Sequence, residues 1–344
     1  MLKAYHQPES CAMPTEPPLI FALHGSQAYA ERVVQRLGWQ LAEHEERLFE
    51  DGEHKSRPLQ PVNARQVLVF HSLHGDDEQS GHDKLCRLLF FCGALKDAGA
   101  RRVQVVAPYL CYGRKERRTE FQDPIITRYV AAMFEACGVD RLLTLEVHSE
   151  AAFDNAFRIP SHNLPGAELF AEHFAAGLAD AEVVAVSPDS GGIKRTELFR
   201  RALQQRIGRP VASAYMAKHR RNDSVTDSLL IGEVRDRTAI IVDDLISTGT
   251  TLLRAAEACQ AAGARHIWAG AVHGLFTGGS TLLDSPLLQR LLVFDTVPPF
   301  RLDPALVAQR LEILDSSAAV AARVVMPAQC SRRRLERSVI RGSP

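Results

Sequence analysis

The sequence of 344 residues has no excess of either charge and no long apolar run. Lysine and arginine number 41 together, and so do aspartate and glutamate. This balance gives no reason to expect a nucleic acid or an anionic membrane as a partner. No apolar stretch approaches the ~18 residues that a membrane-spanning helix needs. Any anion binding therefore has to come from a local arrangement of residues.

Paired cysteines and targeting signals are also missing. The seven cysteines form no Cys-x-x-Cys pair, and several lie within apolar patterns. Free thiols in a reducing compartment are the expected state. The first residues lack the apolar core of a signal peptide. We therefore expect a cytoplasmic protein with a disordered tail at residues 1–17 and a basic tail at residues 329–344.

What the sequence does contain is a regular alternation of short apolar runs with helical patterns. Runs of this kind occupy, for example, residues 19–23, 66–73, 102–109 and 141–148. Strands that are apolar throughout are buried on both faces, which favours parallel sheets covered by helices. The alternation therefore predicts an α/β fold.

An internal repeat indicates how this fold is divided. "ALKDAGARRVQVVAPY" begins at Ala94, and the similar "ACQAAGARHIWAGAVH" begins at Ala258, 164 residues later. An interval near half the chain favours two copies of one α/β domain over a single large sheet. We predict an N-terminal domain at residues 18–164 and a C-terminal domain at residues 165–304. Residues 305–328 are expected to return and pack on the first domain.

The most informative motif is "IIVDDLISTGTT" at residues 240–251, where a buried strand runs into two carboxylates and then a loop of hydroxyls and glycine. Open α/β sheets bind ligands at the carboxyl ends of their strands. Backbone N–H groups at the following helix N-terminus suit a phosphate. Asp243 and Asp244 repel a phosphate but accept hydrogen bonds from vicinal hydroxyls. A sugar phosphate would satisfy both halves of the motif. The alternative interpretation of the motif is a capped helix that follows two solvated aspartates.

Three further strand ends carry polar residues. Arg114 and Lys115 open a basic cluster after one predicted strand, where a polyphosphate could be clamped. His148 follows the next strand, and Asp189 stands before a glycine pair in "SPDSGGIKR". Asp189 could hold a metal or a sugar. A solvated basic loop and a structural histidine are the alternatives.

Two polar segments could complete such a site. "AKHRRNDSVTD" places Lys218 and Arg220 in a loop able to close over a transferring phosphoryl group. "LFEDGEHK" places an aromatic ring and two acids, Phe49, Asp51 and Glu53, around a turn. An aromatic face can stack on a nucleobase, and a carboxylate can accept a hydrogen bond from the amino group of that nucleobase. An exposed basic hairpin and a plain β-turn are the alternatives.

These motifs resemble those of the ribose-phosphate pyrophosphokinase (phosphoribosyl pyrophosphate synthetase) family, in unbroken order over residues 19–325. The segment 240–251 alone also resembles type I phosphoribosyltransferases. The fuller resemblance implies two tandem phosphoribosyltransferase-type (type I) domains, each with a mainly parallel sheet flanked by helices. It also implies transfer of a diphosphoryl group from ATP to ribose 5-phosphate, Mg²⁺ as cofactor, and a homodimer or larger homo-oligomer.

The resemblance assigns a role to each matching position. The implied ribose 5-phosphate site comprises Asp243, Asp244, Ser247, Thr248, Gly249, Thr250 and Thr251. The implied ATP site comprises Phe49, Asp51, Glu53, Arg114 and Lys115, with the hairpin around Asp51 reaching a neighbouring subunit. His148 and Asp189 would bind the metal, and Lys218 and Arg220 would be catalytic.

Three positions depart from the family pattern. Many members have aspartate where Ser247 stands, glutamine where Lys115 stands and aspartate where Glu146 stands. These changes leave the expected activity in place. Two alternatives stay open, namely a phosphoribosyltransferase that consumes phosphoribosyl pyrophosphate and a non-catalytic regulatory homologue of the synthetase.

Overall fold

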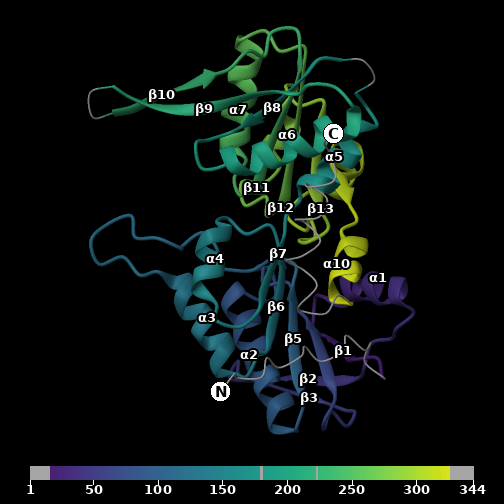
Figure 1. Cartoon of the computed structure of the whole chain (residues 1–344). Helices are drawn as coiled ribbons and strands as arrows, with labels where there is room; N and C mark the ends of the chain where they lie inside the picture. Colours follow the sequence, from purple (N-terminus) through teal and green to yellow (C-terminus); the bar gives the residue numbers. More distant parts are fainter. Residues whose placement is uncertain (1–15, 179–180, 222–223, 326–344) are drawn as a thin grey trace, which may run out of the picture.

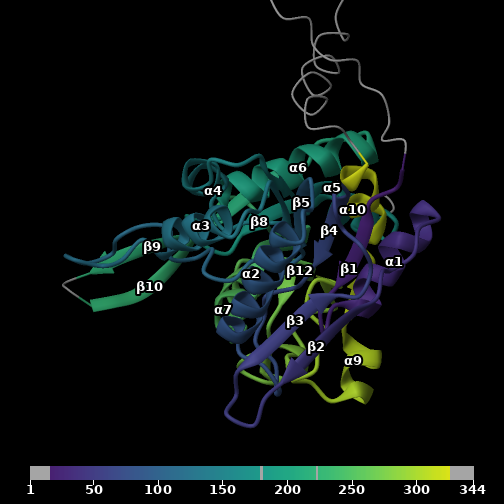
Figure 2. The same ribbon diagram turned by 90° about the horizontal axis from the view of Figure 1, so that it is seen from below.

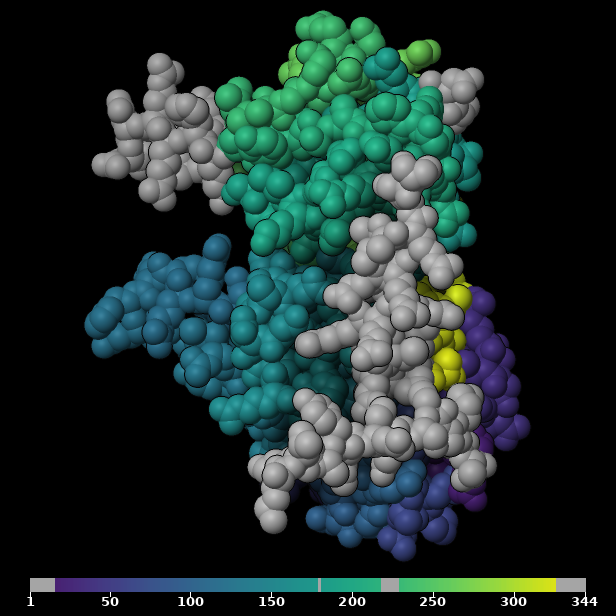
Figure 3. Space-filling view, in the orientation of Figure 1, coloured from purple at the N-terminus to yellow at the C-terminus, as the bar shows by residue number. Residues whose placement is uncertain are grey.

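The computed structural model describes residues 16–178, 181–221 and 224–325, without the side chains of residues 218–221 and 224–228. The chain forms two α/β halves, one above the other in Figure 1, each built on its own parallel sheet. The space-filling view in Figure 3 shows them as two lobes with a notch on the side where the loop after β5 projects. This arrangement confirms the predicted fold class.

The first sheet has five parallel strands in the order β1-β4-β5-β6-β7. Its strands are β1 (Leu19–Ala22), β4 (Gln66–Phe70), β5 (Arg102–Ala107), β6 (Arg141–Leu145) and β7 (Ser161–Leu164). The helices of this half are α1 (Gln27–Leu37), α2 (Gly81–Asp97), α3 (Ile126–Ala136) and α4 (Glu150–Ala156). A separate antiparallel hairpin, β2 (His44–Leu48) and β3 (His54–Pro58), packs beside α2.

The second sheet has seven strands in the order β10-β9-β8-β11-β12-β13-β14. All its neighbouring strands are parallel except the β9–β10 pair. Its strands are β8 (Val183–Ser187), β9 (Ala212–Arg221), β10 (Ser224–Ile231), β11 (Thr238–Ile246), β12 (His266–Gly274), β13 (Arg290–Phe294) and β14 (Glu312–Leu314). Its helices are α5 (Ala167–Ala175), α6 (Ile193–Ile207), α7 (Thr250–Ala261), α8 (Thr281–Asp284) and α9 (Pro304–Arg310).

The two faces of the second sheet are covered by different helices because successive strand residues point to opposite sides. On β11, Ile240 and Val242 share a core cluster with residues of α6, whereas Ile241 lies in the cluster that contains residues of α7. Both faces are therefore buried, as the continuously apolar strands predict. No helix among the described residues is long and apolar enough to cross a membrane.

The last helix of the described residues lies against the first half. Helix α10 (Ser317–Val324) packs against α1, and Figures 1 and 2 show the two side by side. The Tyr29 hydroxyl lies 2.8 Å from Ser316 Oγ, and Arg32 donates to Asp295 Oδ2 at 2.7 Å. One core cluster includes residues of both sheets, α1 and α10. The two halves are thus tied together at a fixed place, although the predicted domain limits themselves stay a prediction.

Buried polar groups also line this junction. Ser72 Oγ donates to the Thr296 carbonyl oxygen at 2.7 Å, and the Ser72 N–H donates to Ser26 Oγ at 3.0 Å. His71 Nδ1 lies 3.2 Å from Ser26 Oγ, and the ring is 1% exposed. Burial, together with the charge of nearby Lys84, lowers the pKa of His71 to about 3. Burial in the fold therefore favours the neutral form of His71.

We expect this histidine to make the protein less stable in mild acid. The unfolded chain takes up a proton on His71 below its ordinary pKa of about 6.5, whereas the folded chain does so only near its lowered value. The stabilisation that comes from burying neutral His71 is fully present above about pH 6.5. It is lost as the pH falls, so the free energy of unfolding should drop by up to about 2 kcal/mol between pH 7 and pH 5. His71→Gln should flatten the pH dependence of the free energy of unfolding in urea. His24→Gln, on the exposed His24, serves as control, and an equal slope in wild type and H71Q would contradict the expectation.

Candidate active site

Two connected cavities lie where the carboxyl ends of the two sheets face each other. The larger has a volume of about 370 Å³ and the smaller about 80 Å³, and both are lined by Arg114, His148, Asp244 and Leu245. The first half contributes residues of β6, α3 and the loops after β5 and β6. The second half contributes residues of β11, β12, α6, α7 and the loops after β8 and β11. The site is therefore shared between the halves.

The acid pair lies at the end of strand β11. Asp243 and Asp244 follow the buried run Thr238–Val242, and their side chains are only 14% and 7% exposed. Asp243 Oδ1 accepts a hydrogen bond from the backbone N–H of Asp244 at 2.9 Å. Two carboxylates so close together in a poorly hydrated place repel each other, so a nearby cation stabilises the pair.

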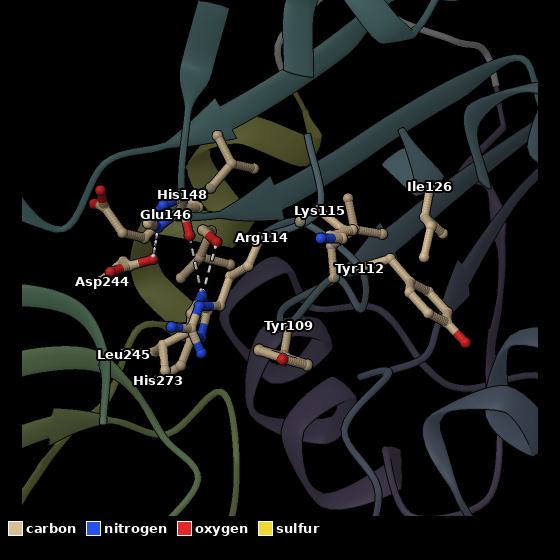
Figure 4. A pocket seen from close by; sticks show the side chains of 14 residues that line it. Tyr109, Tyr112, Arg114, Lys115, Ile126, Glu146, His148, Asp244, Leu245 and His273 are labelled. Atoms are coloured by element: carbon tan, nitrogen blue, oxygen red, sulfur yellow. Dashed lines mark hydrogen bonds and ion pairs between the residues drawn. The ribbon is translucent and has the colours of Figure 1, made fainter. Parts of the chain in front are cut away.

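One partner of this pair comes from the other half. His148 Nδ1 lies 2.8 Å from Asp244 Oδ2, an interaction drawn in Figure 4. His148 follows Glu146, whose left-handed backbone with φ of 37° turns the chain sharply after β6. This turn points His148 across the gap between the two sheets.

The second partner is Arg195, in the first turn of α6. Its Nε donates to Glu146 Oε1 at 2.8 Å, and its Nη1 lies 3.6 Å from Asp243 Oδ1 and 3.7 Å from Asp244 Oδ1. The Arg195 side chain is 12% exposed. Arg195 is not among the site residues expected from the sequence. The signal was the Lys-Arg ending of "SPDSGGIKR", which a plain helix cap does not call for.

The charges in this cluster shift one another's pKa values. Burial and the charge of Asp244 raise the pKa of Asp243. Burial alone would also raise the pKa of Asp244, but the hydrogen bond from His148 and the charge of Arg195 lower it. The same hydrogen bond raises the pKa of His148 against the effect of burial. The contact with His148 and the charge of Arg195 thus favour the ionised form of Asp244.

The loop after β11 has the geometry expected of an anion site. Gly249 caps helix α7 with a φ of 83°, a left-handed conformation that glycine adopts without strain. Ser247 Oγ lies 3.0 Å from Thr277 Oγ1, and Thr248 Oγ1 lies 3.0 Å from Thr250 Oγ1. The N–H groups of the first turn of α7 have no partner within the helix. A phosphate at this position would accept from them.

A second loop is organised around Asp189. Its Oδ1 accepts from the N–H groups of Gly191 and Gly192 at 2.8 and 2.9 Å. Gly192 allows a close approach, because a Cβ there would lie 2.8 Å from Ser187 Oγ. Asp189 lines the smaller cavity together with His148 and the acid pair.

The larger cavity has apolar and aromatic walls, which Figure 4 shows. Tyr109, Tyr112, Ile126 and His273 line it, with Arg114 and Lys115 also in its wall. Tyr109 and His273 are not among the site residues expected from the sequence. His273 Nε2 donates to the Leu145 carbonyl oxygen at 3.1 Å, a contact that again joins the two halves. Lys115 Nζ lies 3.2 Å from Asp123 Oδ2, within the loop that follows β5.

Most of the predicted site residues meet in these cavities, but the hairpin residues do not. Arg114, Lys115, His148, Asp189, Asp243, Asp244, Ser247, Thr248, Gly249 and Thr251 line one cavity or the other, and Thr250 lies beside Thr248. Phe49, Asp51 and Glu53 line neither cavity and form the turn between β2 and β3. Lys218 and Arg220 lie on strand β9, and their side chains are outside the described residues.

Comparison with known proteins gives matches over most of the chain. Residues 18–138 match the N-terminal domain of ribose phosphate pyrophosphokinase, and residues 211–326 match the phosphoribosyl synthetase-associated domain. Ribose-phosphate pyrophosphokinase 1 of Streptococcus pneumoniae serotype 4 is 34% identical over 81% of this chain and 84% of its own. Putative ribose-phosphate pyrophosphokinase 2 of Streptococcus agalactiae serotype V is 35% identical over 81% and 83%.

A solved structure has the same fold. Phosphoribosylpyrophosphate synthetase from Mycobacterium smegmatis superposes with a TM-score of 0.76 at 24% identity, covering 90% of this chain and 98% of that one. The likeness therefore extends over both halves and their arrangement.

Gly278 offers a test of the anion loop. A Cβ at this position would lie 2.7 Å from the Thr248 carbonyl oxygen, so Gly278→Ala has to displace the Thr248–Thr251 loop. We expect the dissociation constant for ribose 5-phosphate, measured by calorimetry, to rise about tenfold or more. Gly93→Ala is the matched control, because a Cβ there meets nothing within 4 Å in the middle of α2. Unchanged affinity in G278A would argue against phosphate binding at this loop.

Proposed function

The chain belongs to the ribose-phosphate pyrophosphokinase family, and we infer that it transfers the β,γ-diphosphoryl group of ATP to the C1 hydroxyl of ribose 5-phosphate. The products are phosphoribosyl pyrophosphate and AMP. The C1 oxygen attacks the β-phosphorus, a new O–P bond forms there, and the bond from this phosphorus to the oxygen bridging to the α-phosphate breaks. AMP leaves with that oxygen, and the proton of the sugar hydroxyl is released.

One structural observation supports this function most directly. The acid pair and the anion loop on β11 and α7 share a cavity with Arg114 and His148 from the other half. A sugar phosphate needs acids for its hydroxyls and backbone N–H groups for its phosphate, and a polyphosphate needs cations on the facing wall. We propose that ribose 5-phosphate binds with its phosphate at Thr248–Thr251 and its hydroxyls at Asp243 and Asp244.

We propose that the triphosphate binds on the facing wall. Arg114 and Lys115 are the cations of the larger cavity, which continues into the smaller one through shared residues. Lys115 is held by Asp123 in the loop after β5, so binding of a phosphate there competes with this ion pair. By resemblance, Lys218 and Arg220 of the β9–β10 segment stabilise the transferring group.

The donor set at this site fits Mg²⁺ delivered with substrate phosphates. Among the described residues there is no group of three or more histidines, cysteines or acids able to hold a metal alone. Mg²⁺ in nucleotide enzymes takes one or two carboxylates and completes its shell with phosphates and water. Asp189 uses Oδ1 for two backbone N–H groups, and we propose that Oδ2, with His148, faces the ion. When bound, the ion neutralises phosphate charge.

We further propose a homodimer or larger homo-oligomer. Phe49, Asp51 and Glu53 have the chemistry expected at a base, yet they line neither cavity of their own chain. Arg47 lies over the Phe49 ring at 4.9 Å, and Phe49 is 38% exposed on the hairpin. A neighbouring subunit could receive this hairpin at its own ATP site. Native mass measurement with and without inorganic phosphate would give the oligomer size.

An assay of AMP release tests the proposed function. We expect AMP to form only when ATP, ribose 5-phosphate and Mg²⁺ are all present, and EDTA to abolish it. Lys218→Ala should lower kcat by at least about a hundredfold, because it removes a charge that stabilises the transferring group, while the circular dichroism spectrum stays unchanged.

Two outcomes would favour the alternatives. Release of pyrophosphate from phosphoribosyl pyrophosphate in the presence of a free base, without AMP formation from ATP, would indicate a phosphoribosyltransferase. Binding of both substrates by wild-type protein with no turnover would indicate a regulatory homologue.

A further inference from the structure

Arg195 occupies an unusual place for a buried cation. It lies in the first turn of α6, where the helix dipole favours acids and disfavours positive charge. It also packs away from water, so its charge has to be met by nearby carboxylates. Burial would lower the pKa of Arg195, but the charges of Glu146 and Asp244 raise it. The carboxylates therefore stabilise a guanidinium at a position that the helix dipole and the lack of solvent both disfavour.

The acids that meet Arg195 come from both halves of the molecule. Glu146 belongs to the loop after β6 in the first half, and Asp243 and Asp244 belong to β11 in the second. Glu146 uses both carboxylate oxygens, since Oε1 accepts from Arg195 Nε at 2.8 Å and Oε2 accepts from the Gly166 N–H at 2.7 Å. The position of the guanidinium is therefore fixed from the first half.

The geometry of the acid pair depends on the same guanidinium. Consecutive residues of a strand point to opposite faces of the sheet, so the carboxylates of Asp243 and Asp244 start out directed apart. Both nevertheless lie within 4 Å of one nitrogen, Arg195 Nη1. A single cation between two like charges draws them toward the same point.

We propose that Arg195 is a positioning residue that holds Asp243 and Asp244 side by side for the sugar hydroxyls, with Glu146 fixing Arg195 from the first half. This inference rests on the proposed function, because it assigns the ribose subsite of that same site. It means that the sugar-binding acids are correctly arranged only when the two halves are together. Arg195 itself does not touch the reacting atoms in this assignment.

Kinetics of Arg195→Gln should separate this role from a purely structural one. Removing the cation that pairs with both acids should raise the KM for ribose 5-phosphate about ten- to hundredfold. The KM for ATP should change less than about threefold, because Arg195 does not line the larger cavity. Arg201→Gln is the matched control, since Arg201 lies on the same helix, has a 72% exposed side chain and, among the described residues, pairs with Glu197 alone.

The double variant Glu146→Gln/Arg195→Gln gives the sharpest readout. Arg195→Gln alone leaves the Glu146 carboxylate buried without its cation, which should lower the Tm. Adding Glu146→Gln removes that unpaired charge, so the Tm should recover while the KM for ribose 5-phosphate stays raised. If the Tm and the KM for ribose 5-phosphate both returned to their wild-type values, Arg195 would serve only to neutralise Glu146. That outcome would overturn the inference.

Calorimetric binding of ribose 5-phosphate distinguishes failure of this inference from failure of the proposed function. A wild type that releases AMP, with an unchanged KM for ribose 5-phosphate in R195Q, overturns the positioning role alone. A wild type that releases no AMP but binds ribose 5-phosphate, with weaker binding in R195Q, supports the positioning role and overturns the activity. A wild type that neither releases AMP nor binds ribose 5-phosphate overturns the proposed function and the positioning role together.

Discussion

Repulsion between two neighbouring buried carboxylates is the constraint on which the site depends. Asp243 and Asp244 stand at the end of a strand that is buried on both faces, and water reaches them poorly. The structure meets this constraint with His148 from the first half and Arg195 from α6. Because His148 belongs to the other half and the Arg195 cation is anchored there by Glu146, the interactions of the acid pair link the two halves.

The fold makes this arrangement possible by directing the carboxyl ends of both parallel sheets toward one cleft. The loops that follow β5, β6, β8 and β11 bring cations, a histidine, an acid and a segment of hydroxyls and glycine to the same cavities. Contacts distant from the cavities hold the halves in register, including the packing of α10 on α1. The stability of the junction and the geometry of the site therefore depend on the same relative placement of the two halves.

The departures from the family pattern each have a local structural account. Ser247 contacts Thr277 Oγ1, so its hydroxyl is part of the loop's own hydrogen bonding. Lys115 pairs with Asp123, which also accepts from the backbone N–H groups of Thr119 and Glu120 and thereby shapes the loop after β5. Glu146 reaches both Gly166 and Arg195. These residues thus join the network around the site.

The sequence by itself determined the α/β class, the strand ends that carry polar residues, and the acid pair followed by a loop of hydroxyls and glycine. These features depend on local periodicity and on residue types within a few positions of one another, and both can be read along the chain. Only the tertiary structure decided that Arg195 meets Glu146, 49 residues earlier, and that His273 meets Leu145, 128 residues earlier. It also placed Phe49, Asp51 and Glu53 away from the cavities of their own chain. Such contacts join residues far apart in sequence and depend on how two finished sheets pack, which no local pattern specifies.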